Sequence, residues 1–234
     1  MVLRKTMNFH TLYRVSIFFT WLMVCTVAHA QRYLDREAIR DAQSDVRQQP
    51  GYAWDHFACL RCRSKHPDVL ILGDSIFDGW SGYLLLVFPN AIIDAKVGRQ
   101  FSGGITQYRS LLRYSGVRKI RTVVVELGTN GAVTHGQVAR FMQLAGPERR
   151  VIFIVPEVPR PWEKEVQTLY AGLPTYYKNV RLEWWNRLST TSSGQERAAD
   201  FWPDGVHPNW TGIQAMVHGL QAIIWKGDHD GHKA

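Results

Sequence analysis

Residues 69–75 read VLILGDS, in which four branched apolar residues run directly into a glycine, an aspartate and a serine. A short apolar run that ends at a glycine is typical of a buried strand followed by a turn. The turn would place the hydroxyl of Ser75 beyond the strand and at the start of the next helix. Free N–H groups at a helix start favour negative charge, so an oxyanion formed by attack of Ser75 would be stabilised there.

Four further short runs rich in Val and Ile follow, and longer mixed stretches separate them. This alternation predicts parallel strands joined by helices, which is an α/β fold: a three-layer α/β/α sandwich with a five-stranded parallel sheet, flavodoxin-like. The expected strands are Val69–Leu72, Ala91–Ala95, Thr122–Leu127, Val151–Val155 and Val180–Trp184. The expected helices lie near residues 77–87, 103–115, 134–145, 163–177 and 209–225.

Ligands of such sheets bind at the carboxyl ends of the strands, where the sequence places further reactive groups. Asp204 and His207 stand three positions apart in a loop before the last expected helix. The carboxylate could hold the Nδ1 proton of His207, which leaves Nε2 free to take the proton of Ser75. A plain surface turn is the alternative, because Asp-Gly is a strong turn signal. The other candidates, His135 and His218, are expected on helix surfaces.

Two more short motifs follow expected strands. Asn130 stands in LGTNG at residues 127–131, and its amide could donate to an oxyanion. Gly98 stands in VGRQ at residues 97–100, where the missing Cβ would let a backbone N–H approach a substrate closely. Each motif alone is a weak signal, and Gly-Asp-Ser by itself is a common turn or helix cap. Their joint occurrence around one sheet is far more specific.

Taken together, the motifs resemble the four sequence blocks of the SGNH (GDSL-like) hydrolases, in order. The matching blocks are residues 73–75, Gly98, residues 128–130 and residues 204–207. The resemblance implies that Ser75 is the nucleophile and that Asp204 and His207 complete a catalytic triad. It also implies an oxyanion hole formed by Ser75, Gly98 and Asn130, and a mechanism that requires no metal and no organic cofactor.

A narrower likeness is carried by DAKVGRQ at residues 94–100, ELGTNG at 126–131 and VPRPWE at 158–163. These segments resemble the extracytoplasmic SGNH domains attached to integral-membrane acyltransferases, including peptidoglycan O-acetyltransferases. Those enzymes move acetyl groups onto envelope polysaccharides through an acyl-serine intermediate. The 234 residues contain no multi-span membrane domain, so transfer would need a separate membrane acyltransferase as partner, and ester hydrolysis is equally open.

The sequence therefore predicts a serine esterase or O-acyltransferase that acts on O-acyl (acetyl) esters of cell-envelope polysaccharide. One alternative is a lipid or small-ester hydrolase, and another is a noncatalytic envelope glycan-binding protein that keeps the fold. Arg160, Trp162 and Trp202 lie in loops beside the expected site and are the candidates for substrate contact. Trp184 and Trp185 are expected in the core.

Residues 1–30 have the layout of a secretory signal peptide, in which basic residues precede an uncharged apolar run that ends in Ala-His-Ala. Cleavage is expected after Ala30, which would make the protein secreted or periplasmic and not membrane-spanning once processed; retention as an anchor is the alternative. Three basic residues leave with this segment, so the formal net charge falls from +8 to +5. Because no Lys/Arg block occurs, nucleic acid is not an expected partner.

The rest of the chain divides into an N-terminal extension over residues 31–66, a catalytic domain over 67–226 and a flexible tail over 227–234. The extension is expected to carry a surface helix over residues 32–47. It also holds Cys59 and Cys62, for which a disulfide is the simplest outcome in an oxidising compartment. A zinc site that adds the neighbouring histidines, His56 and His66, is the alternative.

Overall fold

The computed structural model describes residues 57–58, 68–189 and 198–230 of the 234-residue chain. The expected signal peptide, the surface helix over 32–47 and the Cys59–Cys62 pair lie outside these residues. The strands are β1 (Phe57–Ala58), β2 (Val69–Gly73), β3 (Ile92–Ala95), β4 (Thr122–Glu126), β5 (Arg150–Ile154) and β6 (Val180–Glu183). The helices are α2 (Ser75–Gly79), α3 (Ser81–Val87), α4 (Phe101–Leu111), α5 (Ser115–Lys119), α6 (His135–Ala145), α7 (Glu163–Tyr176), α8 (Trp185–Leu188), the short 3₁₀ turn η1 (Ala198–Asp200) and α9 (Trp210–Asp230).

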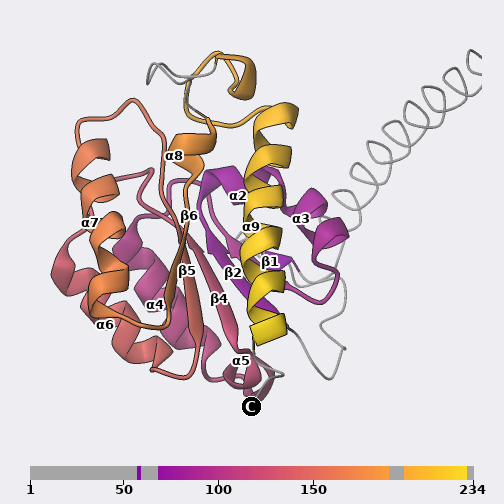
Figure 1. The fold of residues 1–234 in the computed structure, drawn as a ribbon, viewed down its shortest axis with the longest axis vertical. Coiled ribbons are helices and arrows are strands. Elements are labelled where there is room, and N and C mark those ends of the chain that lie inside the picture. The colour runs from indigo at the N-terminus through magenta and orange to yellow at the C-terminus, as the bar shows by residue number, and fades with distance from the viewer. Residues whose placement is uncertain (1–56, 59–67, 190–197, 231–234) are drawn as a thin grey trace, which may run out of the picture.

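The strands form one sheet in the order β1-β3-β2-β4-β5-β6, and β2 to β6 are mutually parallel (Figure 1). The expected α/β class and all five expected parallel strands are thereby confirmed. β1 was not expected, and it adds to the edge of the sheet antiparallel to β3. Its two residues are too few to show an alternating pattern in the sequence.

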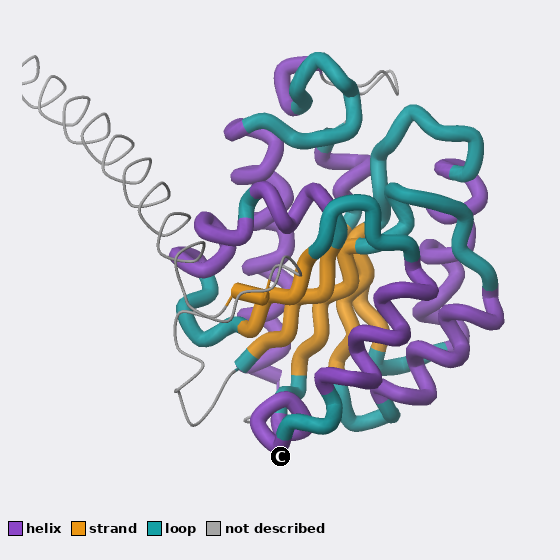
Figure 2. Tube along the Cα trace, turned by 180° about the vertical axis from the view of Figure 1, so that it is seen from behind, coloured by secondary structure: helices purple, strands orange, loops and turns teal. Residues whose placement is uncertain are grey.

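Both faces of the sheet are buried along β2, β3, β4 and most of β5, which explains why these strands are largely apolar. Neighbouring residues point to opposite faces: Leu70 and Leu72 belong to one core cluster, while Val69 and Ile71 belong to the other. The first cluster lies under α4, α5, α6 and α7, and the second under α2, α3 and α9. Figure 1 shows α4, α6 and α7 on one side of the sheet and α3 and α9 on the other, and Figure 2 shows the same layers from behind.

Three expected helices differ in detail from the structure. The helix expected over 77–87 is two helices, α2 and α3, separated at Trp80, because the weak helix former Gly79 ends the first. The helix expected over 103–115 ends at Leu111, and the short α5 follows. α9 continues to Asp230, so the first residues of the expected tail over 227–234 are helical, since one glycine alone does not stop a helix.

The register of the sheet brings the sequence motifs together at one edge. Gly73 at the end of β2 pairs with Ala95 at the end of β3 and with Glu126 at the end of β4. The segments that follow these three strands therefore share the carboxyl edge of the sheet. Within the described part of the chain, no helix combines the length and apolar character needed to cross a membrane.

Candidate active site

Ser75 is the first residue of α2, directly beyond the turn that ends β2. Asp74 caps this helix, and its Oδ1 accepts a 3.1 Å hydrogen bond from the N–H of Ile76. The side chain of Ser75 is partly exposed, so a substrate can reach it. Among the hydrogen bonds between described residues, none uses the N–H of Ser75, which leaves that donor available to an oxyanion.

The imidazole of His207 lies between Ser75 and Asp204. Its Nε2 is 2.9 Å from the Oγ of Ser75, and its Nδ1 is 2.8 Å from Oδ2 of Asp204. Burial raises the pKa of the Asp204 carboxyl, but hydrogen bonds from His207 and from the N–H of Val206 outweigh it and lower the pKa to about 2. An ionised carboxylate therefore holds the Nδ1 proton, and Nε2 faces the serine as an acceptor.

Hydrogen bonds hold the loop that carries His207 at both of its ends. The carbonyl of His207 accepts a 2.9 Å hydrogen bond from the N–H of Trp202. Asn209 caps α9, since its Oδ1 accepts two N–H groups of the first turn, and its Nδ2 donates to two carbonyls of the segment before the loop. Trp80, between α2 and α3, donates from Nε1 to the carbonyl of Pro208 over 3.1 Å.

Gly98 lies in a tight turn after β3, in which the N–H of Arg99 donates to the carbonyl of Lys96 over 3.1 Å. Its φ of +71° is a conformation that residues other than glycine rarely adopt. A Cβ at this position would meet no atom within 4 Å, so the backbone conformation, not a lack of space, requires glycine. Its N–H makes no hydrogen bond to a described residue and is a second free donor at this edge.

Arg99 ties this turn to the end of β2, a role that the sequence analysis missed. Its Nη1 donates to the carbonyl of Gly73 over 3.1 Å and to the carbonyl of Asp94 over 2.6 Å. Its Nη2 pairs with Oδ1 of Asp94 at 2.5 Å, and both side chains are buried. The sequence indicated this role only through the DAKVGRQ segment, which resembles the O-acetyltransferase domains, because a buried ion pair leaves no periodic pattern in the sequence.

Asn130 reaches back to the residue before the nucleophile. Its Nδ2 donates to Oδ2 of Asp74 over 3.0 Å. Glu126, at the end of β4, accepts the N–H of Asp74 on its Oε2, also over 3.0 Å. Burial raises the pKa of Asp74 to about 6, and burial together with the charge of Asp74 raises the pKa of Glu126 well above its ordinary value. The sequence did not indicate this role of Glu126, because a glutamate at the end of an apolar strand is normally exposed to solvent.

The three expected substrate contacts differ in exposure. Trp202 is 53% exposed, and its backbone N–H donates to the carbonyl of His207 over 2.9 Å. Arg160 is exposed in the loop after β5, whereas Trp162 is half-buried and packs against the first core cluster. Their contact with a substrate stays a prediction. Trp185 is buried as expected, and Trp184 is partly buried against the core.

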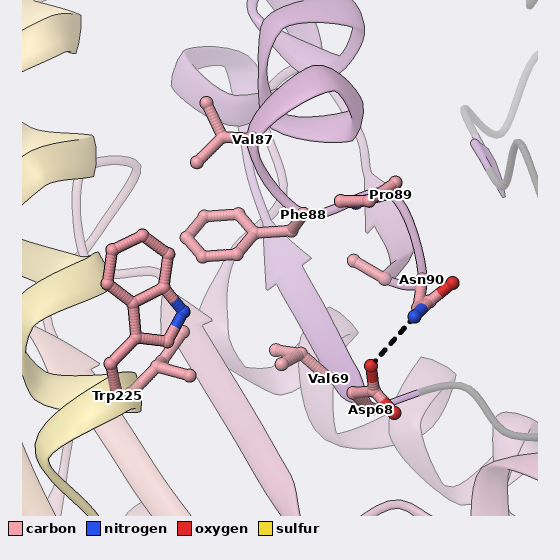
Figure 3. A pocket seen from close by; sticks show the side chains of 9 residues that line it. Asp68, Val69, Val87, Phe88, Pro89, Asn90 and Trp225 are labelled. Carbon is pink, nitrogen blue, oxygen red and sulfur yellow. Dashed lines mark hydrogen bonds between the residues drawn. The ribbon is translucent and has the colours of Figure 1, made fainter. Parts of the chain in front are cut away.

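The two bystander histidines lie where the sequence placed them. His135 is exposed at the start of α6, and His218 is exposed on α9. A separate cavity of about 180 Å³ lies at the amino end of β2 and is lined by residues from β2, from the end of α3 and from α9, including Val69, Phe88 and Trp225 (Figure 3). Because Ser75 follows the other end of β2, this cavity is no part of the candidate active site.

Ser75, His207 and Asp204 are joined by hydrogen bonds in that order, at the carboxyl edge of a parallel sheet. This arrangement defines the class of α/β serine hydrolases.

No family model matches the chain. It is 32% identical over 156 residues to the peptidoglycan O-acetyltransferase OatA of Listeria monocytogenes, over 66% of this chain and 24% of that protein. It is 31% identical over 153 residues to the O-acetyltransferase OatA of Staphylococcus aureus, over 65% of this chain and 24% of that protein. The chain thus spans about a quarter of the length of these curated relatives.

Solved structures show the same fold. A GDSL-like lipase of Bacteroides thetaiotaomicron has a TM-score of 0.58 and 19% identity, over 73% of this chain and 93% of that one. The C-terminal catalytic domain of the Streptococcus pneumoniae peptidoglycan O-acetyltransferase OatA, solved with a methylsulfonyl adduct, has a TM-score of 0.55 and 15% identity, over 70% of this chain and 96% of that one. In its fold and in the order of its four sequence blocks, this chain is similar to the SGNH (GDSL-like) hydrolases.

Proposed function

We propose that this chain is a serine enzyme that removes acyl groups from O-acetyl esters of a cell-envelope polysaccharide or transfers acyl groups to the hydroxyls of that polysaccharide. The observation that carries the proposal is the 2.9 Å separation of His207 Nε2 from Ser75 Oγ, across 132 positions of sequence. Asp204 completes the arrangement at 2.8 Å from Nδ1. A binding protein gains nothing from a nucleophile paired with a base, so the geometry favours catalysis over the noncatalytic alternative.

In the first half of the reaction, His207 Nε2 takes the proton of Ser75 as Oγ attacks the ester carbonyl carbon. The N–H groups of Ser75 and Gly98 and the Nδ2 of Asn130 stabilise the oxyanion of the tetrahedral intermediate. Its collapse breaks the bond between the carbonyl carbon and the alcohol oxygen, and the departing alcohol takes the proton from His207. The acyl group remains on Ser75. In the second half, His207 takes a proton from water or a glycan hydroxyl as its oxygen attacks the acyl carbon. The bond between that carbon and Oγ then breaks, Oγ takes the proton from His207, and the free acid or the acylated glycan leaves.

The glycan substrate is inferred from the relatives, which are O-acetyltransferases, two of peptidoglycan by name. The exposed indole of Trp202 beside the catalytic loop offers a flat surface on which a sugar ring can stack, and the exposed Arg160 offers hydrogen-bond donors for an anionic or polar group. Export by the segment over residues 1–30 would bring the enzyme to this substrate. Acyl transfer, as opposed to hydrolysis, would need a membrane acyltransferase partner as the donor.

Covalent labelling tests the proposal. Methanesulfonyl fluoride should add one sulfonyl group per folded molecule, as measured by intact mass, and Ser75→Ala should remove the labelling. Ser102→Ala, on the exposed side of α4, is the matched control and should label like the wild type. A folded wild-type protein that is never labelled would overturn the proposal.

The substrate class is tested by acetate release from O-acetylated peptidoglycan beside hydrolysis of short-chain and long-chain p-nitrophenyl esters. Trp202→Ala should slow the glycan reaction while changing short-ester hydrolysis little, since only the glycan is large enough to stack on the ring. Preference for the long-chain ester, with no acetate released from the glycan, would instead support the lipid hydrolase.

A further inference from the structure

Glu126 is almost completely buried at the end of β4, yet a charged carboxylate there would be costly. Its Oε2 accepts the N–H of Asp74 over 3.0 Å. Glu126 therefore holds the backbone directly before Ser75. It approaches this closely because residue 73 is glycine: a Cβ there would lie 3.1 Å from Glu126 Oε2 and 2.7 Å from the Cβ of Phe77.

The Glu126 carboxyl, held by the Asp74 N–H, also lies close enough to the Asp74 carboxyl for the charge of one to raise the pKa of the other. Two buried carboxyls this close do not both ionise, so the pair retains a proton. Glu126 is the one that stays neutral. Burial and the neighbouring charge raise its pKa well above the ordinary value, whereas Asp74 accepts hydrogen bonds from Ile76 and Asn130 that favour its ionised form. A neutral Glu126 can accept the Asp74 N–H on one oxygen and donate its O–H to the Asp74 carboxylate.

Tyr170, Arg99 and His207 are the other titratable side chains that come near this pair. Tyr170, from α7, is buried, and burial and the charges of Glu126 and Asp74 raise its pKa well above the ordinary value, so the phenol stays neutral. Its hydroxyl donates to the carbonyl of Leu127 over 2.8 Å. Arg99, from the turn after β3, donates to the carbonyl of Gly73 and is paired with Asp94. His207 approaches only through Ser75, from the solvent side.

An ionised Asp74 has a direct consequence for Asn130. A carboxylate only accepts hydrogen bonds, so it fixes the NH₂ group of Asn130, rather than the amide oxygen, on the side of Asp74. One N–H is used by Asp74, and the second remains free for the oxyanion. A protonated Asp74 could instead donate to the amide oxygen, and the amide could then rotate and withdraw its donor from the site.

We propose that Glu126 is a positioning residue, which in its protonated form holds the turn of Ser75 and keeps Asp74 as the carboxylate that orients Asn130. This inference rests on the proposed function, since it assigns Ser75 and Asn130 their roles in acyl transfer. The positioning role differs from ordinary core packing because it depends on which atoms of the residue 126 side chain donate and accept hydrogen bonds, and not only on the volume of that side chain.

The test compares Glu126→Gln with Glu126→Met. Glutamine reproduces the neutral acid, because its amide can donate to the Asp74 carboxylate and accept the Asp74 N–H, whereas methionine fills the space and does neither. We expect the rate of sulfonylation by methanesulfonyl fluoride and the kcat on p-nitrophenyl acetate to stay within about 3-fold of the wild type in Glu126→Gln. Both should fall by roughly 30-fold or more in Glu126→Met, on the scale of losing one oxyanion donor, with KM little changed.

Asp74→Asn is measured beside them, because it keeps the volume of the side chain and should be as slow as Glu126→Met. A Glu126→Met or Asp74→Asn variant that reacts as fast as the wild type would overturn the positioning role. So would a Glu126→Gln variant as slow as Glu126→Met, because activity would then need an ionised glutamate.

A second readout does not depend on activity. In protein labelled with ¹³C at the glutamate carboxyl, the Glu126 resonance, assigned by its loss in Glu126→Gln, should show a neutral acid at pH 7. An ionised Glu126 at pH 7 would overturn the positioning role alone, while a wild type that methanesulfonyl fluoride never labels would overturn the proposed function.

Discussion

Trp80 Nε1 donates a 3.1 Å hydrogen bond to the carbonyl of Pro208, 128 positions later in the chain. The bond joins the end of α2, the helix that begins at Ser75, to the loop that carries His207. The Trp80 ring also packs against Trp210 at the start of α9, with ring centroids 5.8 Å apart. The distance between Ser75 and His207 is therefore set by contacts outside the triad.

Trp80→Phe should loosen this connection, because it keeps an aromatic ring and removes the donor. We expect a loss of about 1 kcal/mol in the free energy of unfolding, and a fall in kcat larger than any change in KM. Urea denaturation and steady-state hydrolysis of p-nitrophenyl acetate measure the two effects. Trp225→Phe, which changes an exposed indole at the opposite end of the sheet, is the control and should leave kcat unchanged.

Asp204→Asn should leave the loop in place while removing the negative charge that orients His207. The asparagine oxygen can still accept the N–H groups of Val206 and His207, as Oδ1 of Asp204 does at 2.9 Å each. We expect kcat to fall by roughly 10²- to 10⁴-fold, because Nδ1 loses the carboxylate that fixes its proton. The prediction is wrong if kcat on p-nitrophenyl acetate stays within a few-fold of the wild type.

Asn130→Ala should reduce kcat by roughly 10²- to 10³-fold, which corresponds to about 3–4 kcal/mol of lost stabilisation of the oxyanion. KM should change little, since the donor acts mainly on the intermediate. The triad remains complete, so slow covalent labelling by methanesulfonyl fluoride should still reach one group per molecule. A variant with unchanged kcat would remove Asn130 from the oxyanion hole.

Arg99→Met should affect both stability and rate. It leaves the buried carboxylate of Asp94 with Gln107 as its remaining side-chain partner, at 2.6 Å, and breaking a buried pair in this way costs about 3–5 kcal/mol. Adding Asp94→Asn removes the stranded charge, so the double variant should regain stability in urea denaturation. Its kcat should stay low, because the Gly98 turn is still detached from the carbonyl of Gly73. Recovery of both kcat and the free energy of unfolding in the double variant would contradict a role of Arg99 in placing that turn.

The buried carboxyl pair predicts a pH dependence of stability. Because the pKa of Asp74 is raised to about 6 and that of Glu126 is raised well above its ordinary value, the folded protein binds protons that the unfolded chain releases. The contribution of this pair to the free energy of unfolding is fully present at a pH below the ordinary carboxyl pKa range. It is lost as the pH rises through about 6, and the loss amounts to roughly 1–3 kcal/mol. Glu126→Gln should flatten this decline, so its unfolding free energy relative to the wild type should increase between pH 4 and pH 8. Glu148→Gln, at an exposed carboxyl, should run parallel to the wild type.

The sequence determined the fold class and the composition of the expected triad. The apolar runs specify strands because both faces of a parallel sheet are buried, and the motifs that end them must then share one edge. The topology of the chain forces the ends of parallel strands together, which places Ser75 and Asn130 at the carboxyl edge as expected. His207 lies in the loop before α9, and the structure brings its Nε2 to 2.9 Å from the Oγ of Ser75.

Only the tertiary structure decided how these groups are held. The ties made by Trp80, by Arg99 with Asp94, and by Glu126 with Asp74 join segments between 5 and 128 positions apart. Such contacts depend on which side chains happen to meet in three dimensions, and no local spacing or periodicity encodes them. A glutamate at the end of an apolar strand becomes a neutral, buried donor only because the fold encloses it beside a second carboxyl, and that environment exists in the folded chain alone.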